Sequence, residues 1–143
     1  MTPLPPDNWS HKYVGIPYAD RGRDEGGADC WGLACLVYAA ELAVALPSYL
    51  SGYVSADERE EIARLIDHRR EAEGWHAVIE PQPFDLILFR RGTLGSHVGI
   101  HERPGHMLHM DGEDAAKVVR LDDPRWSIRR VGSYRLNRFR GGV

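Results

Sequence analysis

The chain has 143 residues, of which 43% are hydrophobic, and its formal net charge is −3 at pH 7. This length suits one hydrophobic core, so we expect residues 1–143 to form a single domain. The acidic balance argues against a dedicated nucleic-acid-binding protein. The sequence also contains no run approaching the roughly 20 apolar residues that a membrane-spanning helix requires.

The N-terminal segment has no basic stretch followed by an apolar run, which is the pattern of a signal peptide. We therefore expect synthesis in the cytoplasm without a standard export signal. Residues 1–8 are rich in proline and predict an irregular lead-in. Trp9 to Val14 favour a short helix, and the polar, glycine-rich residues 19–28 favour a loop.

The strongest helix prediction starts at Cys30. Asp29 suits the N-cap position, and apolar residues then recur at helical spacing as far as Ala45. Pro47 ends this helix. The capping-box pattern that opens at Ser55 predicts a further, inserted helix over 55–73.

The second half of the chain predicts strands, because short apolar runs alternate there with turn residues. A hairpin is expected around the turn at 102–106. Helices followed by strands indicate an α+β domain with a largely antiparallel sheet. The expected strands are Asp85–Phe89, His97–His101, Met107–Met110, Lys117–Leu121 and Ile128–Leu136.

The two cysteines have different positions on the predicted helix. They are five residues apart and would point to different faces, so no disulfide between them is expected. Cys30 lies in the first turn, where unpaired N–H groups and the helix dipole favour a thiolate, although the carboxylate of Asp29 opposes this. Cys30 is thus a candidate nucleophile, with a buried structural thiol as the alternative. Cys35 is expected in the core.

A cysteine nucleophile needs a base, and the base needs an orienting partner. Four of the seven histidines lie between His97 and His109. A three-residue loop centred on Arg103 or Pro104 would keep these two on one face of the hairpin, whereas an even-length loop would separate them. Two alternatives stay open: structural histidines, and a zinc site made by His97, His101 and His109.

An ordered set of motifs resembles the NlpC family (NlpC/p60 type) of papain-like cysteine peptidases. The resemblance covers residues 9–136, and the closing Val131–Arg135 is similar to the last strand of phage versions. The motifs are Gly15-Ile-Pro-Tyr18, Asp29-Cys-Trp-Gly-Leu33, Leu46-Pro47, Asp85-Leu-Ile-Leu-Phe-Arg90, His97-Val-Gly-Ile100 and Leu108-His109.

The resemblance implies a papain-like NlpC fold, with N-terminal helices packed on an antiparallel sheet. It implies that Cys30 is the nucleophile, that His97 is the base and that His109 orients it. Tyr18 is expected to help form the oxyanion hole; its alternative is an aromatic that packs in the turn. Trp31 replaces the usual serine and is expected, with Asp29, to shape the substrate pocket. No metal or organic cofactor is expected.

The resemblance also implies a function, namely cleavage of peptidoglycan stem peptides at the D-glutamyl to diamino-acid bond. Asp-Cys-Trp-Gly-Leu and the Gly22-Arg-Asp24 loop are similar to phage tail proteins. We therefore expect a phage or phage-like tail component, located in the virion and acting on the periplasmic cell wall. Tail or hub proteins would be its partners, with the inserted helix and the arginine-rich C-terminal segment as docking surfaces. The alternatives are a structural tail-tip or assembly protein without turnover, a zinc hydrolase, and an acyltransferase or amidase.

Overall fold

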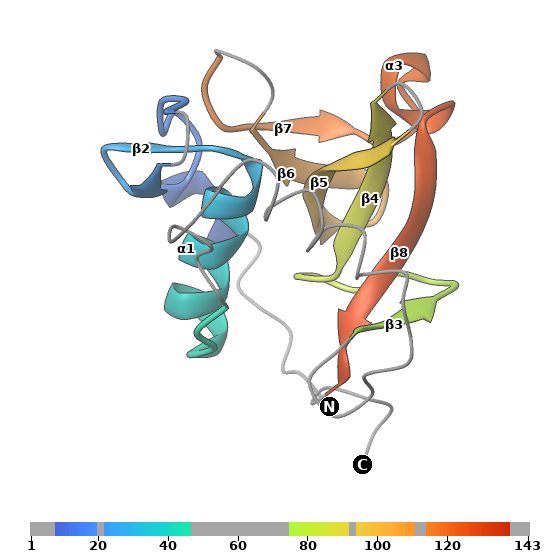
Figure 1. The fold of residues 1–143 in the computed structure, drawn as a ribbon, viewed down its shortest axis with the longest axis horizontal. Coiled ribbons are helices and arrows are strands. Elements are labelled where there is room, and N and C mark those ends of the chain that lie inside the picture. The colour runs from blue at the N-terminus through green and yellow to red at the C-terminus, as the bar shows by residue number, and fades with distance from the viewer. Residues whose placement is uncertain (1–7, 20–21, 47–74, 92–93, 111–113, 138–143) are drawn as a thin grey trace.

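The computed structural model describes residues 8–19, 22–46, 75–91, 94–110 and 114–137. The inserted helix expected over 55–73 and residues 1–7 of the expected lead-in lie outside these ranges. The described elements combine one long helix with a six-stranded sheet (Figure 1). They are η1 (Trp9–Lys12), β1 (Arg23–Asp24), β2 (Gly27–Ala28), α1 (Cys30–Leu42), β3 (Trp75–Val78), β4 (Leu86–Arg91), β5 (Leu94–Arg103), β6 (His106–His109), β7 (Lys117–Arg120), α3 (Pro124–Ser127) and β8 (Arg130–Leu136).

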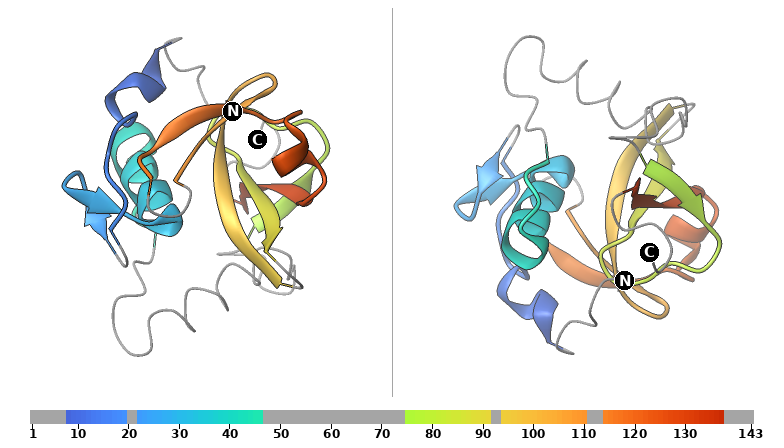
Figure 2. Two further views of the ribbon diagram at one scale, coloured as in Figure 1. Left: turned by 90° about the horizontal axis from the view of Figure 1, so that it is seen from above. Right: turned by 90° about the horizontal axis from the view of Figure 1, so that it is seen from below.

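The main sheet has the strand order β3-β8-β4-β5-β6-β7, and every neighbouring pair is antiparallel. The predicted α+β class with an antiparallel sheet is therefore confirmed. In Figure 1, α1 lies on one side of the molecule and β4, β5 and β8 lie on the other, with β6 and β7 extending towards the helix. Both views in Figure 2 place the small β1–β2 pair beside α1.

The two faces of the sheet bury separate apolar clusters, as the alternation of side chains along a strand requires. In β4, Leu86 and Leu88 point into the large core, which they share with α1 residues such as Trp31 and Val37. Phe89 points to the other face and joins a smaller core. The members of that smaller core are Ile87, Phe89, Met107, Leu121 and Trp126.

Several boundaries differ from those that the sequence predicts. Helix α1 ends at Leu42 rather than Ala45, because Ala43 adopts the left-handed conformation, with φ of 55°. The predicted loop at 19–28 contains the β1–β2 pair. The last strand starts at Arg130 rather than Ile128, because the short helix α3 precedes it and Ile128 is its C-cap. Strand β3 was not predicted.

Candidate active site

Cys30 is the first residue of α1, and the structure confirms Asp29 as the helix cap. The carboxylate of Asp29 accepts a hydrogen bond from the backbone N–H of Gly32 at 2.7 Å. A guanidinium nitrogen of Arg23, on β1, lies 2.8 Å from the same oxygen. Both side chains of this ion pair are largely buried, at 11% and 10% exposure. Arg23 therefore offsets the negative charge that sequence analysis found beside the candidate nucleophile.

The loop that carries Arg23 packs tightly against the first turn of α1. A side chain at Gly32 would collide with the carbonyl oxygen of Gly22, so only glycine allows this approach. That same carbonyl accepts a hydrogen bond from Arg23 at 2.8 Å. The β1–β2 segment is thereby held against the end of the helix where Cys30 lies.

The hairpin of β5 and β6 decides the relative position of the candidate base and its partner. Arg103 pairs with His106, so the turn has two residues and would by itself put His97 and His109 on opposite faces. A β-bulge between His101 and Arg103 shifts the register by one residue. The two histidines return to one face, a step apart, as the predicted loop centred on Pro104 would have placed them.

Contacts from the N-terminal element hold this bulge in place. The carboxylate of Glu102, the residue inside the bulge, is buried and accepts a hydrogen bond from the Ser10 hydroxyl at 2.7 Å. The indole N–H of Trp9 donates to the backbone carbonyl of Glu102 at 3.3 Å. Element η1 thus fixes the backbone of the β5–β6 hairpin from a distance of about 90 residues along the chain.

The two histidines form a buried pair. Nε2 of His97 lies 3.0 Å from Nδ1 of His109, and each residue is only 1% exposed. Gly99 lies in β5 on the same face, where an added side chain would collide with the sulfur of Met107. An imidazole pair linked in this way fixes the tautomer of each ring, because one nitrogen must donate and the other accept.

Aromatic rings enclose the histidine pair. The ring of Trp126 stacks on His97 with centroids 5.1 Å apart and an interplanar angle of 26°. It meets His109 edge-on, at 4.7 Å and 82°. Phe89 adds a further wall, 5.9 Å from His97. Sequence analysis did not single out Trp126, although Asp123-Pro124 before it is a helix-start pattern that could have drawn attention to this segment.

Tyr18 and Trp31 have different surroundings. Tyr18 is half-buried and borders the large core together with Cys30. It also forms an isolated parallel bridge with Ala28, close in sequence to the candidate nucleophile. Trp31 is 1% exposed and belongs to the large core. Trp31 therefore packs in the core at the start of α1, and its role beside the substrate stays a prediction.

The zinc alternative finds no support in the geometry. Among the described residues, no three His, Cys, Asp or Glu side chains converge as a metal site requires. His97 and His109 direct ring nitrogens at each other rather than at a common point. His101 is buried elsewhere on the strand, beside Asp85, and burial lowers the pKa of its imidazole.

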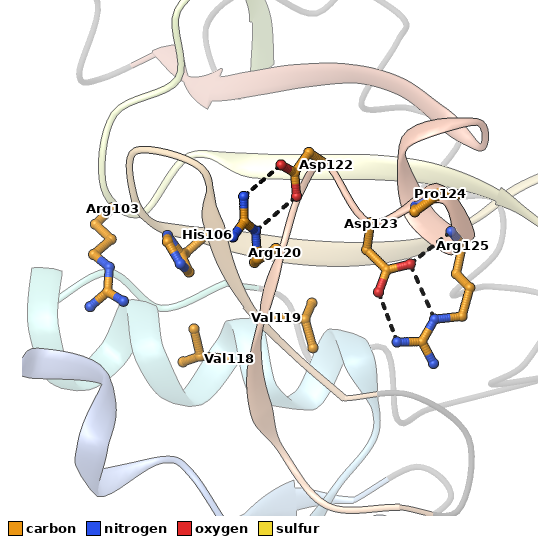
Figure 3. Close-up of a pocket in the computed structure, with 9 residues that line it drawn as sticks. All are labelled: Arg103, His106, Val118, Val119, Arg120, Asp122, Asp123, Pro124 and Arg125. Atoms are coloured by element: carbon orange, nitrogen blue, oxygen red, sulfur yellow. Dashed lines mark hydrogen bonds and ion pairs between the residues drawn. The ribbon is translucent and has the colours of Figure 1, made fainter.

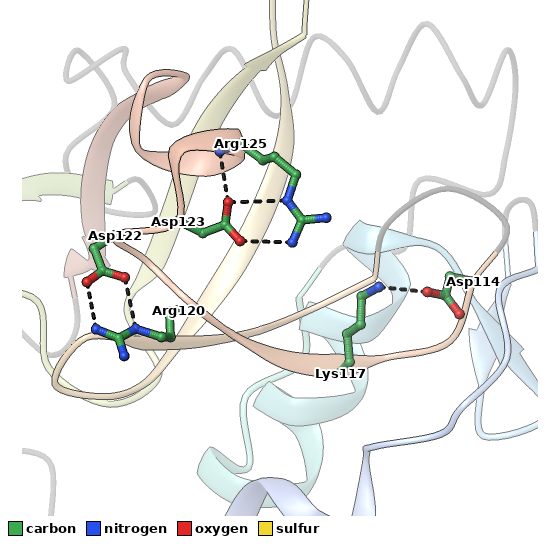
Figure 4. A network of polar contacts seen from close by, with 6 residues as sticks. All are labelled: Asp114, Lys117, Arg120, Asp122, Asp123 and Arg125. Atoms are coloured by element: carbon green, nitrogen blue, oxygen red, sulfur yellow. Dashed lines mark hydrogen bonds and ion pairs between the residues drawn. The ribbon is translucent and has the colours of Figure 1, made fainter.

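A separate groove lies over β7 and the start of α3, and its volume is about 680 Å³ (Figure 3). His97 and His109 are not among its lining residues. Arg120 and Arg125 line it, but each is paired with an aspartate, Asp122 and Asp123 respectively (Figure 4). Arg125 holds the pKa of the Asp123 carboxyl down to about 2. The groove therefore offers little uncompensated charge.

Known proteins share this arrangement of elements. The NlpC/P60 family model matches residues 15–135, which is most of the chain. The chain belongs to the NlpC/P60 family. The match includes all the candidate site residues, from Tyr18 to His109.

A curated relative is the murein DD-endopeptidase MepS/murein LD-carboxypeptidase of Escherichia coli (strain K12), which is 24% identical over 117 residues. The match covers 82% of this chain and 54% of that protein, so the chain spans about half the length of the curated relatives it matches. In the part of the chain that the structure describes, no helix has the length and hydropathy to cross a membrane.

Solved NlpC/P60 structures show the same fold. An NlpC/P60 family protein from Bacillus cereus superposes with a TM-score of 0.65 at 23% identity, over 93% of this chain and 41% of that one. The NlpC/p60 domain of the peptidoglycan hydrolase SagA gives a TM-score of 0.59 at 20% identity, over 88% of this chain and 92% of that one. The predicted NlpC fold is therefore confirmed.

Proposed function

We propose that this protein is a cysteine peptidase that hydrolyses peptidoglycan stem peptides, with Cys30 as nucleophile and His97 as base. The observation that carries the proposal is the buried hydrogen bond between Nε2 of His97 and Nδ1 of His109. It belongs to an NlpC/P60 chain whose main helix starts at a cysteine. The names of the similar proteins, a murein endopeptidase and a peptidoglycan hydrolase, supply the substrate class.

The hydrogen bond to His109 determines which ring nitrogen of His97 can act as the base. Because Nε2 of His97 is committed to His109, a proton from the thiol has to be taken up by Nδ1. The sulfur of Cys30 then attacks the amide carbonyl and forms a tetrahedral intermediate. His97 returns the proton to the departing amine, and the C–N bond breaks to leave an acyl-enzyme. Water, deprotonated by the same imidazole, hydrolyses the thioester and regenerates the thiol.

The developing oxyanion needs hydrogen-bond donors. The backbone N–H of Cys30 at the helix start and the phenol of Tyr18 are our candidates. Arg23 supports the thiolate form, since its guanidinium compensates Asp29 at the cap. Loss of one oxyanion donor typically slows turnover by about a hundredfold or more. Tyr18→Phe is therefore expected to lower kcat with little change in KM.

Digestion of purified peptidoglycan tests the proposal. Wild-type protein is expected to release stem-peptide fragments, which mass spectrometry identifies, whereas Cys30→Ala and His97→Ala release none above background. Cys35→Ala is the matched control, because that thiol lies within α1 and has no role in the reaction. A Cys30→Ala variant as active as the wild type would refute the cysteine mechanism. A folded wild type without activity would favour the structural alternative.

We further propose cleavage at the D-glutamyl to diamino-acid bond and a place in a phage or phage-like tail. The first rests on the family resemblance, and the second on Asp29-Cys-Trp-Gly-Leu33 and the Gly22-Arg-Asp24 loop. Sequencing the released fragments identifies the bond: a new N-terminus on the diamino acid is expected. Mass spectrometry of purified particles tests the location. Absence from the particles, together with no binding to recombinant tail hub protein, would refute it.

A further inference from the structure

Trp126 occupies a position that a purely packing role does not explain. Its ring stacks on His97 while its edge meets His109, so a single side chain contacts both members of the hydrogen-bonded pair. The residue is 6% exposed and lies edge-on to Phe89 at 5.4 Å. The indole therefore covers the line between the two imidazoles and keeps water from it.

The short helix α3 holds the Trp126 ring in this position. The side chain of Asp123 caps α3 by accepting from the Arg125 N–H at 3.0 Å, and Pro124 occupies the start of the helix. The backbone N–H of Trp126 donates to the Asp123 carbonyl at 2.9 Å. The guanidinium of Arg129 then lies 6.0 Å from the centre of the indole ring. The three residues before Trp126, together with Arg129, thus fix the position of the tryptophan.

We propose that Trp126 is a positioning residue that holds His97 in the imidazolium state and orientation that the thiolate of Cys30 requires. The inference rests on the proposed function, because it assumes that Cys30 and His97 react as a pair. The electron-rich face of the indole attracts a stacked cation, and this attraction increases when water is excluded. The same stack prevents the imidazole from rotating away from His109.

Charged groups also lie near His109 and near the indole that contacts the pair. Arg129 lies over the indole and opposes a second positive charge. Asp114 interacts with the charge of His109 and is itself paired with Lys117 at 2.7 Å. Asp29 is compensated by Arg23. The charged side chains near the pair and its indole are thus Asp114 and Lys117 at the start of β7 and Arg129 after α3.

Alkylation of Cys30 by iodoacetamide measures the thiolate directly and needs no substrate. We would compare full-length wild type with Trp126→Leu and Trp126→Phe at pH 6 and pH 9, following Cys30 separately from Cys35 by peptide mass spectrometry. The matched control is Leu121→Ala, which opens the same small core but keeps the indole. Circular dichroism confirms that each variant is folded.

Trp126→Leu is expected to slow alkylation about tenfold at pH 6, where the thiolate depends on the imidazolium, and less than twofold at pH 9. Trp126→Phe should retain most of the reactivity, and Leu121→Ala should match the wild type at both values. If Trp126→Leu slowed alkylation equally at both pH values, or did not slow it at all, the inference would be overturned but the proposed enzymatic function would stand. A wild type without enhanced reactivity at pH 6 would overturn both.

A second measurement keeps the test independent of the thiol. In Cys30→Ala protein, the proton shared by His97 and His109 should give a slowly exchanging imidazole N–H resonance in the NMR spectrum. Introducing Trp126→Leu into this background is expected to broaden that resonance beyond detection through exchange with water. A resonance that persists unchanged would show that the indole does not protect the hydrogen bond.

Discussion

The guanidinium of Arg23 lies 2.8 Å from the carboxylate of Asp29, and this ion pair stands directly beside the residue proposed as nucleophile. The capping carboxylate accepts from the helix N–H and from the guanidinium through the same oxygen. The chain thereby retains a charged cap without placing an uncompensated negative charge next to a thiolate.

We predict that Arg23→Gln destabilises the fold and slows alkylation of Cys30 at neutral pH. Removing one partner of a largely buried pair costs about 3 kcal/mol, since the remaining charge is left without its counter-ion. Urea unfolding gives the stability and iodoacetamide the reactivity. The control is Arg23→Gln combined with Asp29→Asn, which retains a good cap and should recover part of both losses. Strictly additive effects would contradict this coupling.

We expect Ser10→Ala to disturb the β5–β6 hairpin, although Ser10 itself lies in η1. The substitution leaves a buried carboxylate oxygen of Glu102 without its 2.7 Å donor, at a cost of about 2 kcal/mol. Because Glu102 occupies the bulge, we also expect increased hydrogen exchange at His101 and Arg103. Ser133→Ala is a comparison at another buried serine, outside this hairpin. A loss of stability without a local increase in hydrogen exchange would show that the contact with η1 does not hold the bulge in place.

Burial lowers the pKa of the His101 imidazole below its ordinary value of 6.5, because desolvation outweighs the attraction of nearby Asp85. The unfolded chain therefore binds the proton first as the pH falls, and stability decreases from about pH 6.5 down to the pKa in the folded state. Urea midpoints at pH 7.5 and 5.5 measure this slope. His101→Gln should reduce the slope, and an unchanged slope would exclude His101 as its source.

The Asp85–Arg135 pair offers a double-mutant cycle inside the sheet. Arg135 donates two hydrogen bonds to the carboxylate, at 2.9 and 2.7 Å, and the Asp85 side chain is only 5% exposed. Asp85→Ala and Arg135→Met should each cost about 3 kcal/mol, since each leaves a charge without its partner. The double variant should cost less than the sum of the two. A coupling energy below about 0.5 kcal/mol would contradict this expectation.

The sequence predicted the start of the main helix and most strands of the antiparallel sheet, because these depend on local signals. Asp29 before a helical repeat of apolar residues marked the cap, and the structure confirms it. The apolar run Asp85–Phe89 likewise predicted a buried strand, which the structure has as β4. The predictions were wrong at element ends that tertiary contacts set. Helix α1 stops before Ala43, which is in the left-handed region, and β8 starts only at Arg130.

The candidate site was predictable as a set of residue types but not as a geometry. The sequence left three loop alternatives for His97 and His109, and none included a two-residue turn corrected by a bulge. That correction depends on Glu102 meeting Ser10 and Trp9, which lie far away in the sequence. Trp126 escaped notice for the same reason, since only the folded sheet brings it against the imidazoles.

The bulge at Glu102 also constrains how this gene can vary. Between His97 and His109, inserting or deleting one residue within the paired strands would reverse their alternation and turn one imidazole to the opposite side of the sheet. Single-residue changes that preserve the pairing must therefore fall in the turn or at the bulge. Spacing in this segment should be conserved more strictly than the identity of the residues that fill it.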